Sequence, residues 1–233
     1  MRENGHNTIY QMYANTLRQY HYDPAKPIID GEPLYEDHPV AFDPDHRGHS
    51  VAADVRRPLY WDLFEGACGH TYGHHSVWQM FDPERSPYPV NRPLMSWREA
   101  LRQPGAGQMQ YAKRLLLSRP YFTRIPATDE VIVADENRSI MPGEGIYHFA
   151  ATRDTEGSYL MVYAPVGRTF EVNTAVIHGS KLTGWWFNPR NGKSQRIARV
   201  EKGERVRFIS PNLGEELDWI LIVDDASKGY KRP

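Results

Sequence analysis

The sequence predicts an α/β region followed by an all-β region. Helical spacing alternates with short apolar runs over roughly the first 120 residues, whereas short strands separated by turn signals begin near residue 131. Two prolines, Pro120 and Pro126, interrupt both patterns between the regions. The chain has 233 residues, of which 40% are hydrophobic, enough for one large or two modest domains. We therefore expect two domains, 1–125 and 130–233.

Helices and strands alternate in the first region. Asn7 or Thr8 is a candidate N-cap, and Ser96 with Glu99 forms a capping-box pattern that opens a further helix. Asp54 is the expected N-cap of another helix. Helical spacing predicts helices over 9–20, 54–64 and 108–118, and short apolar runs predict buried strands over 27–30 and 67–72.

Short strands dominate the second region. They are expected over 131–134, 146–152, 158–163, 182–187, 196–200, 205–209 and 219–223. The segments Asp154–Gly157 and Asn188–Gly192 are strong turn signals between them. Strands of this length at regular spacing are typical of a β-sandwich or barrel.

Charge and composition exclude several classes of partner. The 28 Lys and Arg residues nearly balance the 29 Asp and Glu residues, so we expect neither nucleic acid nor an anionic membrane as a partner. The chain has no run of about 18 apolar residues that could span a bilayer. The single cysteine, Cys68, lies in an apolar run and is interpreted as structural. The N-terminus has no apolar signal region, which favours a cytoplasmic location.

The first region is too short for a complete (β/α)8 barrel. Such a barrel needs eight strand–helix units and roughly 250 residues, whereas the first 120 residues hold about two units. Buried parallel strands without neighbours would expose apolar faces and unpaired backbone groups. We therefore expect this region to be unstable or self-associating unless it is paired, and the β region to fold independently.

An acidic stretch follows the first predicted strand. Glu32 lies just after that strand, and catalytic side chains of α/β barrels project from the carboxyl ends of strands. Glu36 is a second acidic candidate in the same loop, and Tyr35 could donate a hydrogen bond to a carboxylate. The alternative is an acidic surface loop without catalytic function.

A stretch rich in histidine and aromatic residues follows the second predicted strand. It contains His70, Tyr72, His74, His75 and Trp78. Imidazoles could bind sugar hydroxyls and an indole could stack on a sugar face, so these residues are candidates for substrate binding. The alternative is a set of core histidines with protein partners. The glycines beside two of these histidines argue against a helical zinc pair, and no metal site is predicted.

The chain also lacks a glycine-rich phosphate loop and a nucleophile elbow, and we predict no cofactor.

Two long motifs resemble a known family of glycoside hydrolases. The segments Lys26–Glu36 and Gly66–Gln79 resemble the C-terminal part of the catalytic barrel of the apiosidase-like (DUF4038) glycoside hydrolases. The "putative collagen-binding" domain that follows that barrel is resembled by the segments Ala151–Asp154, Gly157–Tyr159, Trp185–Arg190 and Asp218–Trp219. The resemblance implies a partial (β/α)8 TIM barrel, formed by its last strands and helices, followed by a C-terminal β-sandwich.

The resemblance also implies a function. The family is expected to contain retaining glycosidases that act on plant cell-wall glycans, including the removal of apiose-linked side chains. The expected nucleophile corresponds to Glu32, with Glu36 as the second candidate. The family's acid/base residue comes from an earlier strand, in a Gly-Gly-Asp type of motif that this sequence lacks.

Two functions remain open from the sequence. The chain could be a glycosidase fragment that requires the missing half of the barrel, through another polypeptide or through self-association. Alternatively, it could be a non-catalytic carbohydrate-binding or adhesion module built on the β region. Both hypotheses predict a carbohydrate partner.

Overall fold

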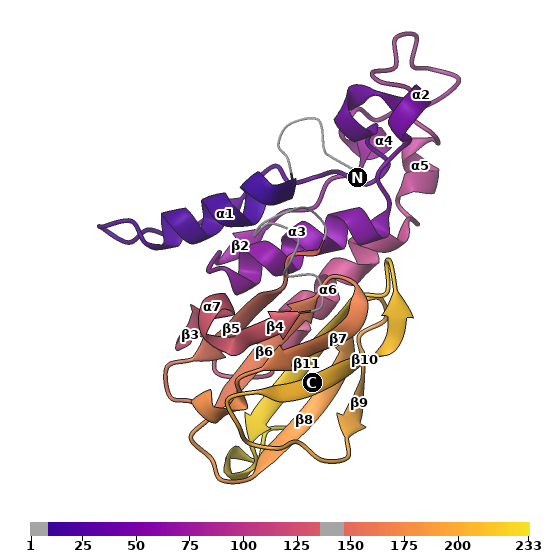
Figure 1. Cartoon of the computed structure of the whole chain (residues 1–233). Helices are drawn as coiled ribbons and strands as arrows, with labels where there is room; N and C mark the ends of the chain where they lie inside the picture. The colour runs from indigo at the N-terminus through magenta and orange to yellow at the C-terminus, as the bar shows by residue number, and fades with distance from the viewer. Residues whose placement is uncertain (1–8, 136–146) are drawn as a thin grey trace. The chain divides into compact units, whose positions relative to one another are not determined.

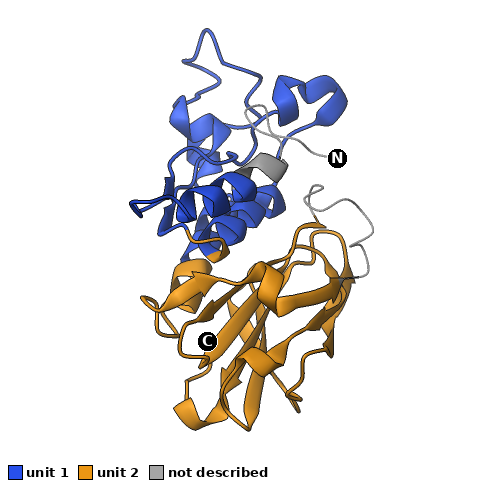
Figure 2. Cartoon of the chain, turned by 60° about the vertical axis from the view of Figure 1, so that its left-hand side comes forward, with its two compact units in different colours: residues 1–63, 67–110 blue, residues 64–66, 111–233 orange. Residues whose placement is uncertain are grey.

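The computed structural model of the chain describes residues 9–135 and 147–233 (Figure 1). The chain divides into two compact units, residues 1–63 with 67–110 and residues 64–66 with 111–233 (Figure 2). The proposed caps Asn7 and Thr8, and the start of the strand expected at Ile146, lie outside the described residues. Helices with short parallel strands in one unit and antiparallel sheets in the other confirm a mixed α/β chain.

Helices and short strands alternate in the first unit. Its elements are α1 (Ile9–Tyr20), β1 (Ile29–Asp30), η1 (Val40–Phe42), α2 (Pro44–Arg47), α3 (Ala52–Phe64), β2 (Gly69–His70), α4 (His75–Trp78), α5 (Trp97–Ala100) and α6 (Pro104–Leu116), of which α3 and α6 continue into the second unit. The helices expected near 9–20, 54–64 and 108–118 are therefore present. Every helix in the described part of the chain is too short or too polar to cross a membrane.

The start of helix α5 agrees with the prediction, whereas the start of α3 does not. Helix α5 has the expected capping box, in which Ser96 Oγ accepts from the Glu99 N–H and Glu99 Oε2 accepts from the Ser96 N–H. The expected N-cap role of Asp54 is wrong, because α3 begins two residues earlier at Ala52. Asp54 instead lies in the first turn, where its Oδ2 accepts from the Val51 N–H at 2.9 Å.

Strands β1 and β2 form a parallel pair that places two polar residues side by side. Their register pairs Ile29 with Gly69 and Asp30 with His70. The prediction that these strands are buried is wrong for Ile29, which is 62% exposed, and Cys68 before β2 is also exposed. Within the described residues the sheet contains β1 and β2 alone, so no further strand covers these apolar side chains.

The second unit contains two antiparallel sheets. One has the strand order β3-β5-β6-β11-β8-β9 and the other the order β10-β7-β4. The elements are β3 (Arg124–Pro126), α7 (Thr128–Val131), β4 (Ile132–Asp135), β5 (Ala150–Asp154), β6 (Tyr159–Ala164), β7 (Gly167–Val172), η3 (Thr174–Val176), β8 (Leu182–Asn188), β9 (Lys193–Ile197), β10 (Val206–Gly214), β11 (Trp219–Asp225) and η4 (Ala226–Lys228). Strands β6 and β11 are buried along their whole length and lie at the centre of the larger sheet.

The two sheets of the second unit share one hydrophobic core. Trp186 from β8 lies 6.0 Å from Phe170 of β7 and 6.4 Å from Phe208 of β10, measured between ring centroids. These aromatic pairs join the inner faces of the two sheets. Trp185 is only partly buried, which agrees with the expectation that adjacent residues of a strand point to opposite faces.

Strand β7 has no counterpart among the predicted strands. Arg168 occupies an inward position two residues before Phe170, so a charged residue interrupts the apolar alternation. The protein accommodates it by placing the guanidinium 4.9 Å from the Tyr147 ring centroid and 5.4 Å from that of Phe149. The strand expected over 196–200 is also shifted, since β9 begins at Lys193 directly after the turn that ends at Gly192.

Candidate active site

Glu32 lies exposed in the loop that follows β1. Its backbone N–H donates to Asp30 Oδ1 at 3.1 Å, which ties the start of the loop to the end of the strand. Tyr35 packs over Gly73, where an added Cβ would overlap the tyrosine ring. Burial and the negative charge of Glu32 both raise the pKa of Tyr35, so the phenol keeps its proton and remains a hydrogen-bond donor at neutral pH.

Glu36, four residues further on, has a different environment. It is 1% exposed, and both carboxylate oxygens accept hydrogen bonds: Oε2 from the Tyr72 hydroxyl at 2.5 Å and Oε1 from the Gly105 N–H at 3.2 Å. Its own N–H donates to Gly73 O at 2.9 Å. Burial and the hydrogen bond with Glu36 raise the pKa of Tyr72. Glu36 therefore links the loop after β1 to the N-terminus of α6, where the helix dipole favours a negative charge.

Removing the Tyr72 hydroxyl should destabilise the first unit without affecting exposed groups. The Tyr72→Phe variant leaves Glu36 Oε2 without this donor, and we expect a loss of about 1.5–3 kcal/mol, typical of a buried hydrogen bond to a charged group. Urea unfolding of the full chain measures the loss. Tyr88→Phe is the matched control, because Tyr88 is 91% exposed and its substitution should have little effect. Equal stability of the two variants would contradict this role of Glu36.

Two of the histidines considered for substrate binding lie inside the first unit. His74 is 2% exposed, and its Nδ1 accepts from the Ser76 N–H at 3.1 Å at the start of α4. Its Nε2 lies 3.2 Å from Asp37 Oδ2. His75 is fully buried, its Nε2 lies 3.0 Å from Val90 O, and burial lowers the pKa of its imidazole. A neutral His75 donates this hydrogen bond and thereby holds the segment at residue 90.

Trp78 differs from these histidines because its side chain reaches the surface. It is 51% exposed, and its indole N–H donates to His75 Nδ1 at 3.3 Å. The hydrogen bond fixes one edge of the indole while part of the ring stays accessible to solvent. An aromatic ring held in this way can stack on an apolar sugar face.

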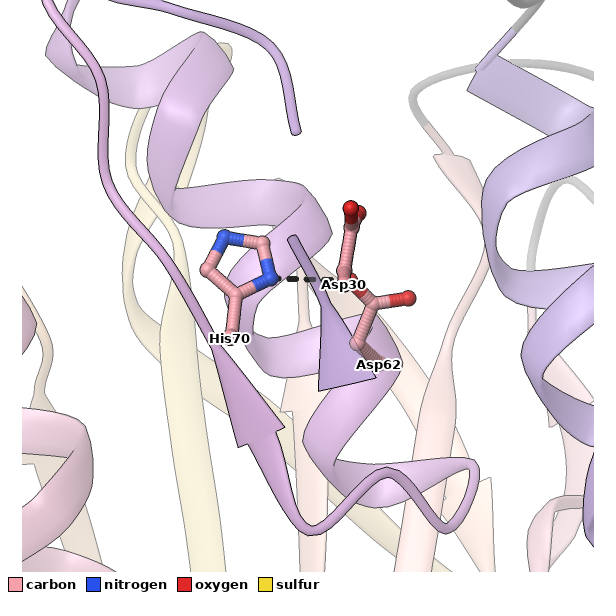
Figure 3. Close-up of side chains that lie close together, drawn as sticks. All are labelled: Asp30, Asp62 and His70. Carbon is pink, nitrogen blue, oxygen red and sulfur yellow. Dashed lines mark hydrogen bonds and ion pairs between the residues drawn. The ribbon is translucent and has the colours of Figure 1, made fainter. Parts of the chain in front are cut away.

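His70 belongs to a polar cluster with Asp30 and Asp62 (Figure 3). The three side chains come from β2, β1 and α3, and their potential ligand atoms lie within 4.8 Å of one another. His70 Nδ1 lies 2.8 Å from Asp62 Oδ2, and Thr16 of α1 donates its hydroxyl to Asp62 Oδ1 at 2.8 Å. One imidazole and two carboxylates are a donor set that could hold a divalent cation, although here the histidine and Asp62 are bonded to each other.

The cluster predicts a defined effect of pH on stability. Burial and the charge of Asp62 raise the pKa of Asp30, while His70 opposes the shift. The folded protein therefore keeps this proton at a pH where the unfolded chain has lost it, and stability falls as pH rises through that window. We expect Asp30→Asn, which cannot ionise, to gain stability relative to the unmodified protein as pH rises from 3 to 6. The comparison uses thermal unfolding across this range, and a difference independent of pH would contradict the prediction.

The sequence analysis predicted no contribution from Asp62, Thr16 or Gly105. The helical pattern could have indicated the first two as buried polar residues. Asp62 continues the stripe of Val55 and Leu59, and Thr16 lies on the apolar stripe of α1. A polar residue on an apolar stripe needs a buried partner. Gly105 gave no such signal, because its contribution is a backbone N–H.

Comparisons with known proteins identify families for both parts of the chain. The model for "Apiosidase-like, catalytic domain" matches residues 1–123, and the model for "Putative collagen-binding domain of a collagenase" matches residues 125–224. A search of curated proteins gives no match.

Two solved structures are similar to almost the whole chain. A protein titled "Glycoside hydrolase" is 34% identical over 94% of this chain, with a TM-score of 0.82. A glycoside hydrolase family 5 protein from Bacteroides vulgatus is 31% identical over 96% of this chain, with a TM-score of 0.85. This chain spans 46% of the length of each of these structures. By the family match and these two relatives, the chain belongs to the apiosidase-like family of glycoside hydrolases, as its two long motifs predicted.

Proposed function

We propose that this chain supplies part of the active site of a retaining glycoside hydrolase, with Glu32 as the nucleophile. The observation that carries the proposal is the contrast between two glutamates of one loop. Glu32 is exposed directly after a parallel strand, where barrel enzymes place catalytic side chains. Glu36 is buried with both oxygens occupied by protein donors.

Retaining hydrolysis assigns a distinct step to each of two carboxyl groups. Glu32 attacks the anomeric carbon and forms a glycosyl ester, while a carboxylic acid about 5 Å away gives its proton to the departing oxygen. That second group then removes a proton from water, which attacks the anomeric carbon, breaks its bond to the Glu32 oxygen, and releases the sugar with its configuration retained and the carboxylate restored. We assign this second group to a part of the barrel outside this chain, consistent with the missing Gly-Gly-Asp type of motif.

Two other residues complete the proposed sugar site. Tyr35, which keeps its proton and whose pKa is raised by the nearby Glu32 charge, is the residue that we propose to donate to the Glu32 carboxylate and hold it for attack. Trp78 offers an accessible ring for stacking on the substrate, a plant cell-wall glycan. Protein groups already engage His70, His74, His75 and Tyr72, so we assign these four residues a supporting role rather than direct contact with the sugar.

The arrangement of the strands supports a partial (β/α)8 barrel over 1–125 and a β-sandwich over 130–233. A strand, a helix and a second parallel strand follow one another in the first unit, as in barrel enzymes. Ile29 is exposed where a neighbouring barrel strand would cover it. We therefore propose the complementary barrel half as the partner of this surface, with self-association as the alternative. The shared core of the two antiparallel sheets supports the sandwich.

The purified chain should have no hydrolytic activity by itself, because it lacks the acid/base group that protonates the leaving oxygen. A chimera tests this: the chain is joined to the part of the Bacteroides vulgatus relative outside the shared region. We expect the chimera to hydrolyse aryl glycosides or plant cell-wall oligosaccharides and the isolated chain to hydrolyse neither. Activity of the isolated chain would show that it contains both carboxyl groups. A folded chimera that binds glycans without hydrolysing them would favour a non-catalytic carbohydrate-binding module.

A further inference from the structure

The loop that carries Glu32 is fixed at both ends. At its start, the Glu32 N–H donates to Asp30 Oδ1 at 3.1 Å, a link between residues two apart. At its end, the Glu36 N–H donates to Gly73 O at 2.9 Å. The acceptor at the end is a backbone carbonyl, whereas the acceptor at the start is an ionisable side chain. The position of Glu32 therefore depends on where the Asp30 carboxyl group is held.

The Asp30 carboxyl group lies beside two side chains from neighbouring elements. Its register opposite His70 puts both side chains on the same face of the β1–β2 pair, and Asp62 approaches from α3 (Figure 3). The Asp62 and His70 side chains are almost fully buried, at 1% and 2% exposed. Thr16 of α1 fixes the remaining oxygen of Asp62. The potential ligand atoms of Asp30, Asp62 and His70 lie within 4.8 Å of one another, so a buried carboxylate and a buried imidazole flank the Asp30 carboxyl group that accepts from the Glu32 N–H.

We propose that Asp30 is a positioning residue for Glu32, and that the Asp62–His70 pair behind it holds its carboxyl group in the orientation that fixes the Glu32 backbone. This inference rests on the proposed nucleophilic function of Glu32. An exposed side chain needs a rigid backbone to present its oxygen to an anomeric carbon, because catalytic groups must be held close to their productive geometry. The charge of Asp30 also strengthens the bond, since an ionised acceptor binds an N–H more strongly than a neutral one.

Nuclear magnetic resonance of the full chain tests the proposal without requiring activity. Glutamate is labelled with ¹⁵N, and the Glu32 signal is identified by its loss in Glu32→Gln. We expect the chemical shift of the Glu32 amide proton to change as Asp30 titrates. The change should occur above the ordinary pH range of an aspartate, because burial and the charge of Asp62 raise the pKa of Asp30. The Glu36 amide, bonded to a backbone carbonyl, serves as the internal reference.

Three substitutions and a control separate positioning from general stability. Asp30→Ala removes the acceptor, and the Glu32 amide should exchange with solvent about tenfold faster or more while the Glu36 amide stays protected. Asp30→Asn keeps an acceptor oxygen, so protection should return while the dependence on pH disappears. His70→Ala should weaken protection at Glu32 by freeing Asp30. Asp23→Asn, an exposed aspartate before β1, is the control and should change neither amide.

The results that would overturn the positioning proposal differ from those that would overturn the proposed function. A Glu32 amide that does not respond to pH, or that remains protected in Asp30→Ala, would overturn the positioning proposal even if Glu32 is the nucleophile. If the amide behaves as expected but the chimera with Glu32→Gln remains active, the proposed nucleophile is wrong and the contact between Asp30 and Glu32 is structural.

Discussion

Replacing Glu32 by Gln should lower the turnover of the chimeric glycosidase by about 10³-fold or more, the scale observed when a covalent nucleophile is removed. The amide is similar in size to the carboxylate but cannot form the glycosyl ester. Binding of the glycan should change little, because Trp78 and Tyr35 remain in place. Turnover of an aryl glycoside with a good leaving group and binding of an oligosaccharide are the two measurements.

Glu36→Gln is the matched control for this experiment, because it removes the same charge from the same loop. Its carboxylate is buried and bonded to Tyr72 and Gly105, so we expect lower stability while the folded fraction keeps its turnover. Glu32→Ala with added azide supplies a second readout, since azide can attack the anomeric carbon in place of the carboxylate. Near-normal turnover of Glu32→Gln, or loss of turnover only in Glu36→Gln, would exclude Glu32 as the nucleophile.

The contrast between these two glutamates shows what local sequence can predict. The position of Glu32 follows from its place after a strand, which is a property of a short segment. The burial of Glu36 depends on Gly105, 69 residues away along the chain, and on a backbone N–H that every residue except proline provides. Sequence spacing therefore located the loop but could not tell an accessible carboxylate from a buried one.

The same limit explains the strands that were predicted well or missed. Strands β6 and β11 have nearly continuous apolar runs, which identify buried central strands from their own residues. Strand β7 carries inward-facing Arg168, and its burial depends on aromatic rings supplied by Tyr147 and Phe149. The pattern of one segment therefore predicts a strand when its buried residues are apolar. It fails when a buried polar residue needs partners from other segments.

The second unit contains a buried ion pair with a large expected contribution to stability. The Arg119 side chain is 0% exposed, and its Nε and one terminal nitrogen each donate to a different oxygen of Asp224 at 2.8 Å. The other terminal nitrogen donates to the backbone oxygens of Ser118 and Lys231, and the guanidinium lies 4.9 Å from the Tyr230 ring centroid. Arg119 thus joins the start of the unit to β11 and the C-terminal segment.

We expect Arg119→Ala to destabilise the second unit by about 3–5 kcal/mol, because it leaves the Asp224 carboxylate buried without its cation. Burial already raises the pKa of Asp224 while Arg119 opposes the shift, so the loss should be smaller at low pH, where Asp224 takes up a proton. Hydrogen exchange in β6 and β11 measures the opening of this unit. Arg205→Ala is the control, since exposed Arg205 and half-buried Glu171 form a surface pair at 2.7 Å, and such pairs are worth about 0–1 kcal/mol. Equal losses in the two variants, or a loss that does not change with pH, would show that Asp224 does not depend on Arg119 for its charge.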